Sequence, residues 1–469
     1  MKSRRRVNSA LRPFYYETSL RTSSLGLTGM KRHVISSAGL LLAITLLFPN
    51  LLGSLTNVNA QTPLPRQESY QFTNGQWFDG SGFRRRAFYS VNGVLTVKKP
   101  ARIDKVFDLK NRYVVPPFAE GHNHWLEPQR VDEYIQNYLR DGVFYVKDEA
   151  NMPYIVSQFR EKLNRPTSVD FITALQGFTG SGGHPLEIIR QFQKVGVLPK
   201  EWSERDFDGH AVMIVNDAKD IPSRWSLLLE SKPDFVKVFL NYSGPGETRK
   251  DNPKKTGLDP KFLPEIVRLA HKAGLYVSAH ISTAADFHNA LVAGVDEIAH
   301  LPFIDFQKEL ANEHFLISET DARLAARHGV RVITTLGWLR ADLGDDPQRE
   351  NEARTLVVIP NLQLLKRHGV KLLVGSDQFR QTSLPEVLLI SSMEVFTNLE
   401  LLKMYCEVTP QAIFPKRKIG FLRKGYEASF LVLDGNPLTN FEEIKNVRLR
   451  FKQGLYLQAS DRLRGSHHR

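Results

Sequence analysis

Short apolar runs alternate with amphipathic segments through the middle of the chain. Eight runs rich in Val, Ile, Leu and Phe predict strands at residues 113–118, 142–147, 170–176, 234–240, 276–281, 297–301, 331–336 and 371–375. Most are separated by stretches with helical periodicity, such as residues 261–273 and 284–293. Strand–helix alternation with β-branched strands indicates a parallel α/β sheet. Eight such units over about 280 residues predict a (β/α)8 TIM-like barrel. An open doubly wound sheet is the alternative, although no Gly-rich phosphate loop follows the first strand.

The pattern changes at both ends of the chain. From residue 70 to residue 106, short alternating segments are separated by Asn74-Gly75, Asp79-Gly80 and Asn92-Gly93, which predict strands joined by tight turns. Residues 428–435 and 447–457 again have the pattern of strands. We therefore expect a composite β-sandwich from residues 61–116 and 418–460, a barrel over 117–417, and a disordered tail over 461–469.

The N-terminus accounts for much of the positive charge. The formal net charge is +13, and residues 1–60 carry eight Lys or Arg and one acidic residue, so +7 lies there and about +6 remains. A basic start at Met30, an apolar core at residues 38–48, and Val58-Asn59-Ala60 before Gln61 are typical of a secretion signal. We expect translation to start at Met30, cleavage after Ala60, and a secreted or periplasmic protein with no membrane or nucleic-acid partner. An uncleaved anchor is the alternative.

Composition sets the remaining bounds. The chain has 469 residues, 42% apolar and 24% charged, which is enough for one large catalytic domain and a smaller one. It has one cysteine, so no intrachain disulfide is possible. Cys406 lies in an apolar helical stretch, and we expect it to be packing in the core.

Titratable residues gather at the predicted carboxyl ends of the strands, where barrel enzymes place their functional groups. His122 and His124 follow the first strand, and residues two apart on a strand point to the same side. The other strand-end residues are Lys237, His280, His300 and Asp377. Imidazole and carboxylate ligands suit zinc or a similar divalent ion.

Lys237 has an unusual setting, because it alternates with Val236 and Val238 and must face the other way. A lysine that points into a barrel is unfavourable unless its charge is neutralised or paired. Carbamylation of the amine is one solution, since it creates an oxygen ligand that can bridge two cations. An ion pair with an inward acidic residue is the alternative.

As a set, the motifs GHNH, FVKVF, AHKAGLYVSAHI, ALVAGVDEIAHLP and LVGSDQF resemble the amidohydrolase superfamily of metal-dependent hydrolases. The resemblance covers residues 70–457 and is closest to the imidazolonepropionase-like and Xaa-Pro dipeptidase-like branch. It implies that His122, His124 and Asp377 bind a first metal, that His280 and His300 bind a second, and that carbamylated Lys237 bridges them. Asp377 would also be the general acid and base.

The same resemblance bears on substrate binding. It implies that His184, in Gly182-Gly183-His184, helps to bind a substrate carboxylate. The tyrosine that often follows the strand-5 histidine in those relatives is absent, because residues 282–285 are Ser-Thr-Ala-Ala. Tyr242 is a substitute candidate. Histidines at predicted helix ends (His271, His328 and His368) are expected to be structural.

These inferences predict an exported amidohydrolase that cleaves a C–N bond of a small amide through a metal-activated water, with two divalent ions, zinc being the expected metal. The amide could be a dipeptide, an N-acyl amino acid or a cyclic amide. Two alternatives stay open. One is a mononuclear cyclic imide hydrolase or heterocycle deaminase with unmodified Lys237. The other is an inactive, metal-stabilised binding protein. Homo-oligomerisation stays open as well.

Overall fold

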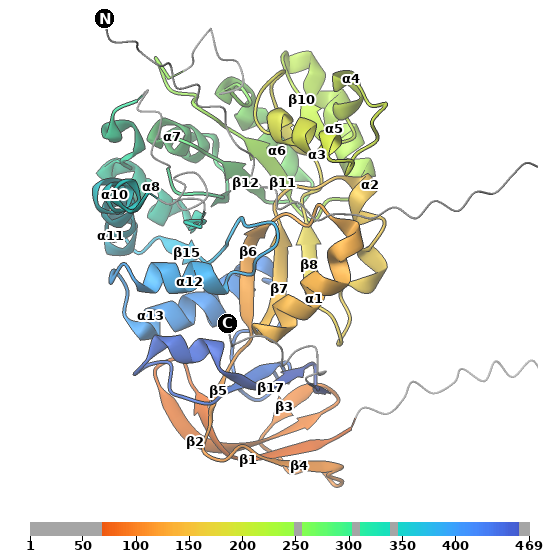
Figure 1. Cartoon of the computed structure of the whole chain (residues 1–469), viewed down its shortest axis with the longest axis vertical. Coiled ribbons are helices and arrows are strands. Elements are labelled where there is room, and N and C mark those ends of the chain that lie inside the picture. The colour runs from red at the N-terminus through yellow and green to blue at the C-terminus, as the bar shows by residue number, and fades with distance from the viewer. Residues whose placement is uncertain (1–67, 248–255, 303–309, 338–345, 459–469) are drawn as a thin grey trace, which may run out of the picture. The chain divides into compact units, whose positions relative to one another are not determined.

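The structure is a computed structural model that describes residues 68–247, 256–302, 310–337 and 346–458 (Figure 1). Residues 64–469 form one compact unit. The predicted secretion signal, its cleavage site and the predicted tail lie outside the described residues. No helix in the described ranges combines the length and the apolar character needed to cross a membrane.

A mixed eight-stranded sheet combines strands from both ends of the chain. Its order is β18-β17-β16-β5-β1-β2-β3, with β4 paired to β1. The strands are β1 (Tyr70–Phe78), β2 (Phe83–Val91), β3 (Val94–Thr96), β4 (Lys105–Asp108), β5 (Tyr113–Val115), β16 (Phe430–Leu433), β17 (Val447–Lys452) and β18 (Leu455–Leu457). Strand β16 pairs antiparallel with β5, with Val432 opposite Val114, so the C-terminal strands extend the N-terminal ones (Figure 1).

An aromatic cluster shows that this sheet curls onto itself. The ring of Phe72 on β1 lies 4.9 Å from those of Phe430 and Phe451, although β5 and β16 separate β1 from β17 in the sheet. Phe430 and Phe451 stack at 4.6 Å. Aromatic pairs of this kind contribute about 0.5–1.5 kcal/mol each beyond the area that they bury.

The three predicted turns have two different outcomes. Asn92-Gly93 joins β2 to β3 with positive φ at both residues (49° and 74°), as a tight hairpin turn requires, and Asp79-Gly80 lies between β1 and β2. The prediction of a turn at Asn74-Gly75 is wrong. These residues form a bulge inside β1, where the register with β2 shifts and Asn74 has φ 54°.

The middle of the chain forms two parallel sheets. One has the order β6-β7-β8 and the other β10-β9-β11-β12-β13-β14-β15. The strands are β6 (Phe118–Asn123), β7 (Val143–Asp148), β8 (Asp170–Thr173), β9 (Gly177–Thr179), β10 (Val212–Ile214), β11 (Val236–Phe239), β12 (Val277–His280), β13 (Glu297–Ile298), β14 (Arg331–Ile333) and β15 (Lys371–Leu373). The fold is therefore α/β, as predicted.

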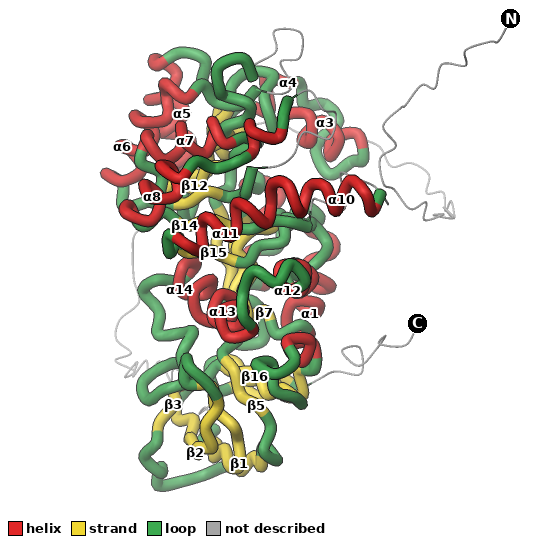
Figure 2. Tube along the Cα trace, turned by 90° about the vertical axis from the view of Figure 1, so that its left-hand side faces the viewer, coloured by secondary structure: helices red, strands yellow, loops and turns green. Residues whose placement is uncertain are grey.

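Helices connect most of these strands. In two places a wide π-helical turn joins one helix to the next. The helices are α1 (Val131–Arg140), α2 (Pro153–Val156), α3 (Leu186–Lys194), α4 (Glu204–Phe207), α5 (Ile221–Glu230), α6 (Leu263–Lys272), α7 (Ala284–Ala293), α8 (Glu319–His328), α10 (Pro347–Ala353), α11 (Ile359–Arg367), α12 (Leu384–Ser391), α13 (Asn398–Lys403) and α14 (Thr409–Ile413). Arg354–Val358 joins α10 to α11 (Figure 2), and Met404–Val408 joins α13 to α14. Cys406 lies in the second turn and is fully buried, as expected.

The ends of helix α7 are set by capping residues that can be recognised in the sequence. Thr283 caps its N-terminus by accepting from Asp286 N, and the Asp286 side chain reaches back to complete a capping box. Gly294 ends the helix in the left-handed region, at φ 85°. The prediction of a helix over residues 284–293 is therefore confirmed.

Backbone hydrogen bonds link the two parallel sheets. Gly121 N donates to Val374 O at 2.8 Å, which joins β6 to the chain just after β15. Asp234 N donates to Thr173 O at 2.9 Å, which joins the end of β8 to the chain just before β11. The described strands thus form two linked sheets of three and seven strands, and a single closed eight-stranded barrel stays a prediction.

Two details of the predicted strand list are wrong. The first predicted strand, at residues 113–118, is divided between β5 and β6 by Pro116-Pro117, because proline has no N–H for a strand ladder. Strands β9 and β10, of three residues each, were not predicted.

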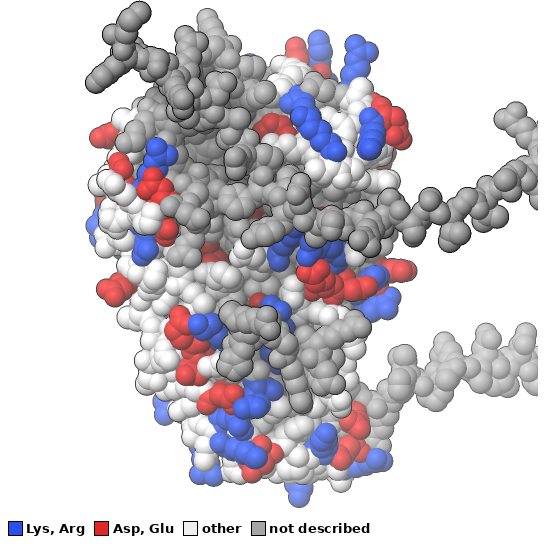
Figure 3. All heavy atoms as spheres, viewed as in Figure 1, with Lys and Arg blue, Asp and Glu red and all other residues white. Residues whose placement is uncertain are grey.

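Charged side chains of both signs are interspersed on the described surface that Figure 3 shows. Many form short ion pairs, such as Arg130 with Glu133 at 2.6 Å and Arg380 with Glu127 at 2.8 Å. Exposed pairs of this kind add about 0–1 kcal/mol each to stability.

A buried ion pair connects the mixed sheet to strand β8. Lys452 Nζ on β17 lies 2.6 Å from Asp170 Oδ1 and donates to Arg165 O at 2.8 Å. Arg417 approaches the other oxygen of Asp170 at 2.8 Å. The Lys452 side chain is fully buried, and burial lowers its pKa although Asp170 opposes that shift.

Asp170→Asn should therefore destabilise the protein strongly, because it leaves the buried Lys452 ammonium group without its counter-ion, while Arg417 keeps Glu427. We expect a loss of about 3–5 kcal/mol in the free energy of unfolding, measured by urea denaturation. Asp434→Asn is the matched control. Asp434, like Asp170, pairs with two basic side chains, but it does so at the surface. That change should cost at most about 1 kcal/mol. Equal effects of the two substitutions would contradict this account.

Candidate metal centre

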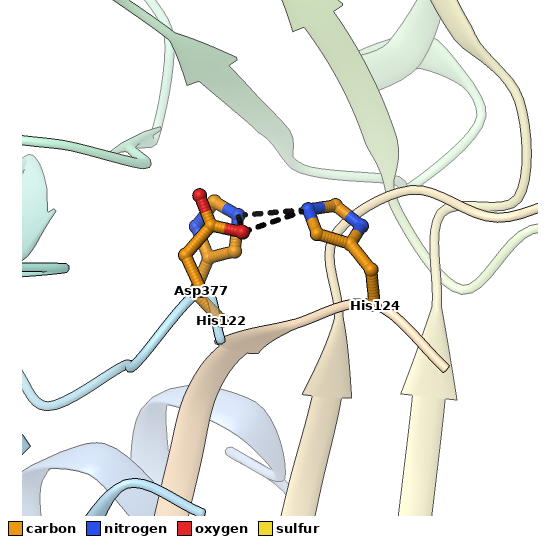
Figure 4. Close-up of side chains that lie close together, drawn as sticks. All are labelled: His122, His124 and Asp377. Atoms are coloured by element: carbon orange, nitrogen blue, oxygen red, sulfur yellow. Dashed lines mark hydrogen bonds and ion pairs between the residues drawn. The ribbon is translucent and has the colours of Figure 1, made fainter. Parts of the chain in front are cut away.

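Three side chains from two distant parts of the sequence converge at the carboxyl ends of the strands (Figure 4). His122 lies in β6, His124 directly follows it, and Asp377 lies in the loop after β15. His122 Nε2 and His124 Nε2 are 3.2 Å apart. Asp377 Oδ1 lies 3.2 Å from His124 Nε2 and 3.5 Å from His122 Nε2.

The opposite nitrogen of each imidazole determines which tautomer is present. His122 Nδ1 lies 3.0 Å from Ala299 O, and His124 Nδ1 lies 2.7 Å from Ala150 O. A carbonyl oxygen only accepts, so each Nδ1 carries the proton and donates. A longer contact of 3.3 Å from Ala150 N to His124 Nδ1 is the weaker of the two. In the neutral rings, each Nε2 therefore presents a lone pair to the other.

This arrangement fits a metal ion. Burial holds the pKa of His122 well below its usual range, and the Lys237 charge lowers it further, so the ring is neutral near pH 7. Asp377 Oδ1 is buried and accepts no hydrogen bond among the described residues. Burial alone would lower the pKa of His124, but the Asp377 carboxylate raises it. When both rings are neutral, two lone pairs and a carboxylate oxygen face one point and repel one another unless a positive charge, a proton or a metal ion, lies between them. Two imidazoles and a carboxylate form a donor set that zinc accepts.

The other predicted ligands line the same cavity, whose volume is about 360 Å³. These are Lys237, His280 and His300. The ring of His300 lies 4.6 Å from that of His122 and 4.5 Å from that of His280. Burial lowers the pKa of both His280 and His300 well below the usual value, so their rings are also neutral near pH 7. The structure therefore brings all six candidate ligands together, and their individual roles stay predictions.

Lys237 has a buried partner that the sequence analysis did not name. Its Nζ donates to Glu149 Oε2 at 2.9 Å, and Lys147 Nζ lies 2.5 Å from Glu149 Oε1. Ser278 Oγ donates to the same carboxylate at 2.9 Å. Burial alone would raise the pKa of Glu149, but the two lysines lower it to about 2. The ion pair is one of the two solutions that the sequence left open for Lys237, and carbamylation stays a prediction.

Glu120 is a second buried acidic residue that the sequence analysis did not name, and it contacts the backbone of the candidate ligand His122. Its Oε1 accepts from His122 N at 3.1 Å and from Ser376 N at 2.7 Å, and its Oε2 accepts from Ser376 Oγ at 2.7 Å. Burial raises the pKa of Glu120 to about 8. Glu120 is two residues before His122 and so faces the same side, and an acidic residue inside an apolar strand was the available signal.

Two residues at the candidate metal centre, one of them a candidate ligand, have strained backbone conformations. Asp377 has φ 50° and Thr335 has φ 47°, and a β-branched residue rarely adopts such a value. Thr335 Oγ1 lies 2.8 Å from His300 Nδ1, so the strained residue holds the imidazole. Strain of this kind persists only where the surroundings impose it, and it concentrates at functional sites.

Of the two candidate substrate-binding residues, His184 and Tyr242, only His184 is among the described residues that line the cavity. His184 lines the cavity, its ring stacks on His280 at 4.4 Å, and its Nδ1 lies 2.7 Å from Glu187 Oε1. Tyr242 is not among the described lining residues, and its backbone N–H donates to Asp286 at 3.1 Å. A role for Tyr242 in substrate binding stays a prediction.

Two of the three histidines that were set aside as structural pair with acidic residues outside the cavity. His271 Nε2 lies 2.9 Å from Asp296, and His368 Nε2 lies 2.6 Å from Glu319. Neither is among the described residues that line the cavity.

The sequence model of the Amidohydrolase family matches residues 246–455. That range includes His280, His300 and Asp377 but begins after His122, His124 and Lys237. Ochratoxinase from Aspergillus niger is 27% identical over 252 residues, which are 51% of this chain and 50% of that protein. The match thus spans half the length of that relative.

Solved structures with the same fold cover more of the chain. A. niger ochratoxinase superposes with a TM-score of 0.64 at 18% identity, over 83% of this chain and 96% of that one. A Xaa-Pro dipeptidase with bound methionine superposes with a TM-score of 0.65 at 15% identity, over 83% of this chain and 100% of that one. At these identities the similarity establishes the fold alone.

The metal centre can be tested by substitution. His122→Ala and His124→Ala should each remove about one equivalent of tightly bound divalent metal, because each takes away a nitrogen ligand from a site with few ligands. The measurement is elemental analysis of zinc-loaded protein after dialysis. His271→Ala removes a surface histidine and should leave the metal content unchanged. Full metal content in both cavity variants would exclude this centre.

Proposed function

The chain matches the amidohydrolase family in its sequence and in its fold, and on that premise we propose that it is a metal-dependent hydrolase. Its target is the C–N bond of a small amide, such as a dipeptide, an N-acyl amino acid or a cyclic amide. The observation that carries the proposal is the convergence of His122 Nε2, His124 Nε2 and Asp377 Oδ1 in a cavity that three further candidate ligands also line. Relatives named ochratoxinase and Xaa-Pro dipeptidase support an amide or peptide bond as the target.

The metal ion would be held by His122, His124 and Asp377, and when bound it would lower the pKa of a water molecule and polarise the substrate carbonyl. In this proposal Asp377 moves the proton. Its Oδ1 faces the two imidazoles, while its Oδ2 lies 3.8 Å from His300 Nδ1. In this role Asp377 accepts a proton from the attacking water and passes it to the leaving amine.

A second ion would be held by His280 and His300, with carbamylated Lys237 between the two ions. The alternative is a mononuclear enzyme that opens a cyclic imide or deaminates a heterocycle. The ion pair between Lys237 and Glu149 favours this alternative, since it satisfies the lysine without modification. Metal content distinguishes the two, because a bridged site holds about two equivalents and an unbridged site about one. Export, with cleavage after Ala60, is part of the proposal.

The activity itself is tested by screening zinc-loaded protein against dipeptides and N-acyl amino acids. We expect hydrolysis of at least one class, its loss after treatment with a chelator, and its recovery when zinc is added back. Fully metal-loaded protein that hydrolyses nothing across this panel and a set of cyclic amides would instead indicate a metal-stabilised binding protein.

Asp377→Asn tests the proton-transfer role. The substitution keeps an oxygen that can face the metal but removes the group that takes up the proton. We expect kcat to fall by about 100-fold to 10,000-fold, with bound metal retained, as measured by steady-state kinetics and elemental analysis. Asp434→Asn, at an exposed carboxylate, should leave kcat unchanged. Activity that survives Asp377→Asn would reject the role of Asp377 as acid and base.

A further inference from the structure

The cavity has an apolar wall and a polar wall. The apolar wall includes Leu126, Met152, Ile188, Phe192 and Phe379. Among the lining residues that the structure describes, Lys237 is the only lysine and there is no arginine, and Lys237 is paired with Glu149. A cavity of about 360 Å³ lies within the usual range for small-molecule sites.

Helix α3 supplies the centre of the apolar wall. Ile188 and Phe192 are four residues apart and so share one face of the helix. Both line the cavity and are only half-buried, whereas Leu186 is 2% exposed and packs in the core. The ring of Phe192 meets that of Phe379 edge to face at 5.6 Å. Half-buried apolar side chains that face a cavity gain free energy when an apolar group of a ligand displaces water from them.

The apolar wall reaches the metal centre. The ring of Phe379 lies 5.7 Å from the ring of His124. Phe379 also follows Asp377 by only two residues in the sequence. An apolar group that lies on this wall would therefore be next to the scissile bond of a substrate bound at the centre.

The polar wall is built around His184 and Asn241. Ser282 Oγ donates to Asn241 Oδ1, and no described residue accepts from the amide Nδ2 of Asn241, so this group can donate to a ligand. Glu187 holds the ring of His184 through Nδ1, so the other ring nitrogen remains for a ligand. Asn241 Nδ2 can donate to a carbonyl or carboxylate oxygen, and His184 Nε2 can do so when its ring carries a proton on both nitrogens.

We propose that the substrate is an amide that carries a bulky apolar group, aromatic or branched, beside the scissile bond and, separately, a carboxylate or carbonyl group. The apolar group lies against Ile188, Phe192 and Phe379, and the oxygen-bearing group is held by His184 and Asn241. This inference rests on the proposed function and narrows its substrate class. An anionic group on the apolar wall is unfavourable, because among the described lining residues the one lysine, Lys237, is paired with Glu149 and there is no arginine.

Matched compounds test the proposal. The panel is N-(3-phenylpropanoyl)glycine and N-acetylphenylalanine, which place a phenyl group on opposite sides of the amide, against N-acetylglycine and N-succinylglycine. We expect kcat/KM for at least one phenyl compound to exceed that of both others by about tenfold or more. The phenyl compound that wins identifies which side of the amide faces α3. Equal or better turnover of N-succinylglycine would overturn the proposal.

Binding of the same panel to zinc-loaded Asp377→Asn protein, measured by calorimetry, separates this inference from the proposed function. One outcome is that a phenyl compound binds more tightly than the compounds without a phenyl group, while the unaltered protein hydrolyses none of them. That outcome would reject the proposed function but support the proposed class of ligand. Turnover without a preference, or binding without one, would reject the ligand class.

Phe192→Ala locates the preference on the wall. We expect it to lower kcat/KM for the preferred phenyl compound by about tenfold or more, mainly through a higher KM, because the lost contact stabilises substrate and transition state alike. The value for N-acetylglycine should stay the same. Gln191→Ala changes the exposed neighbour on α3 and should alter neither value. Because Phe192 is half-buried, thermal unfolding should show an intact fold, and an equal effect of Phe192→Ala on both compounds would refute the assignment.

Discussion

Two imidazole lone pairs and a carboxylate oxygen face one point, and this electrostatic constraint organises the centre of the protein. His122 Nε2 and His124 Nε2 are 3.2 Å apart, which is unfavourable for two acceptors in a buried site without a cation. The surrounding structure does not let either ring turn away, because each Nδ1 donates to a backbone carbonyl. Ligands are thus held in place by hydrogen bonds behind them, as is typical of metal-binding histidines. The arrangement is understandable as a site prepared for a positive charge and is difficult to explain as packing.

The same constraint explains why the sheets are linked where they are. Residues 122 and 377 are far apart in sequence, and Asp377 N donates to His122 O at 2.7 Å while Gly121 N donates to Val374 O. Glu120 adds a side-chain connection between the two segments through Ser376. Gly375 is required here, since a Cβ would lie 2.7 Å from His122 N. The left-handed conformation of Asp377 then turns its carboxylate toward the histidines, and the three hydrogen-bonded connections offset the strain.

The sequence predicted the α/β class, the strand-end ligands and most parallel strands, because these depend on patterns of period two and on residue type. Its errors have local causes. Pro116-Pro117 divides one predicted strand between two sheets, and Asn74-Gly75 forms a bulge where the dipeptide usually forms a turn. Glu149 and Asn241 could not be assigned, since their roles depend on neighbours that are 88 and 41 residues away in the sequence. Glu120 was visible as an acidic residue inside an apolar strand, but its partner Ser376 is 256 residues away. The apolar wall was equally inaccessible, because Ile188, Phe192 and Phe379 meet only after α3 has packed beside the loop that follows β15.

The interior charges show how the protein can keep a lysine at the metal centre. Glu149 is bound by Lys147, Lys237 and Ser278, and Lys147 also pairs with Glu297, which Arg331 contacts at 3.1 Å. Breaking a buried pair is costly mainly when it leaves one charge without a partner. Here Glu149 retains Lys147 and Ser278 whether Lys237 stays an ammonium group or becomes an oxygen ligand. Lys147 has a second acidic partner, so it does not depend on Glu149 alone. The network therefore does not depend on Lys237 alone, and the ion pair with Glu149 stabilises the unmodified ammonium form of Lys237.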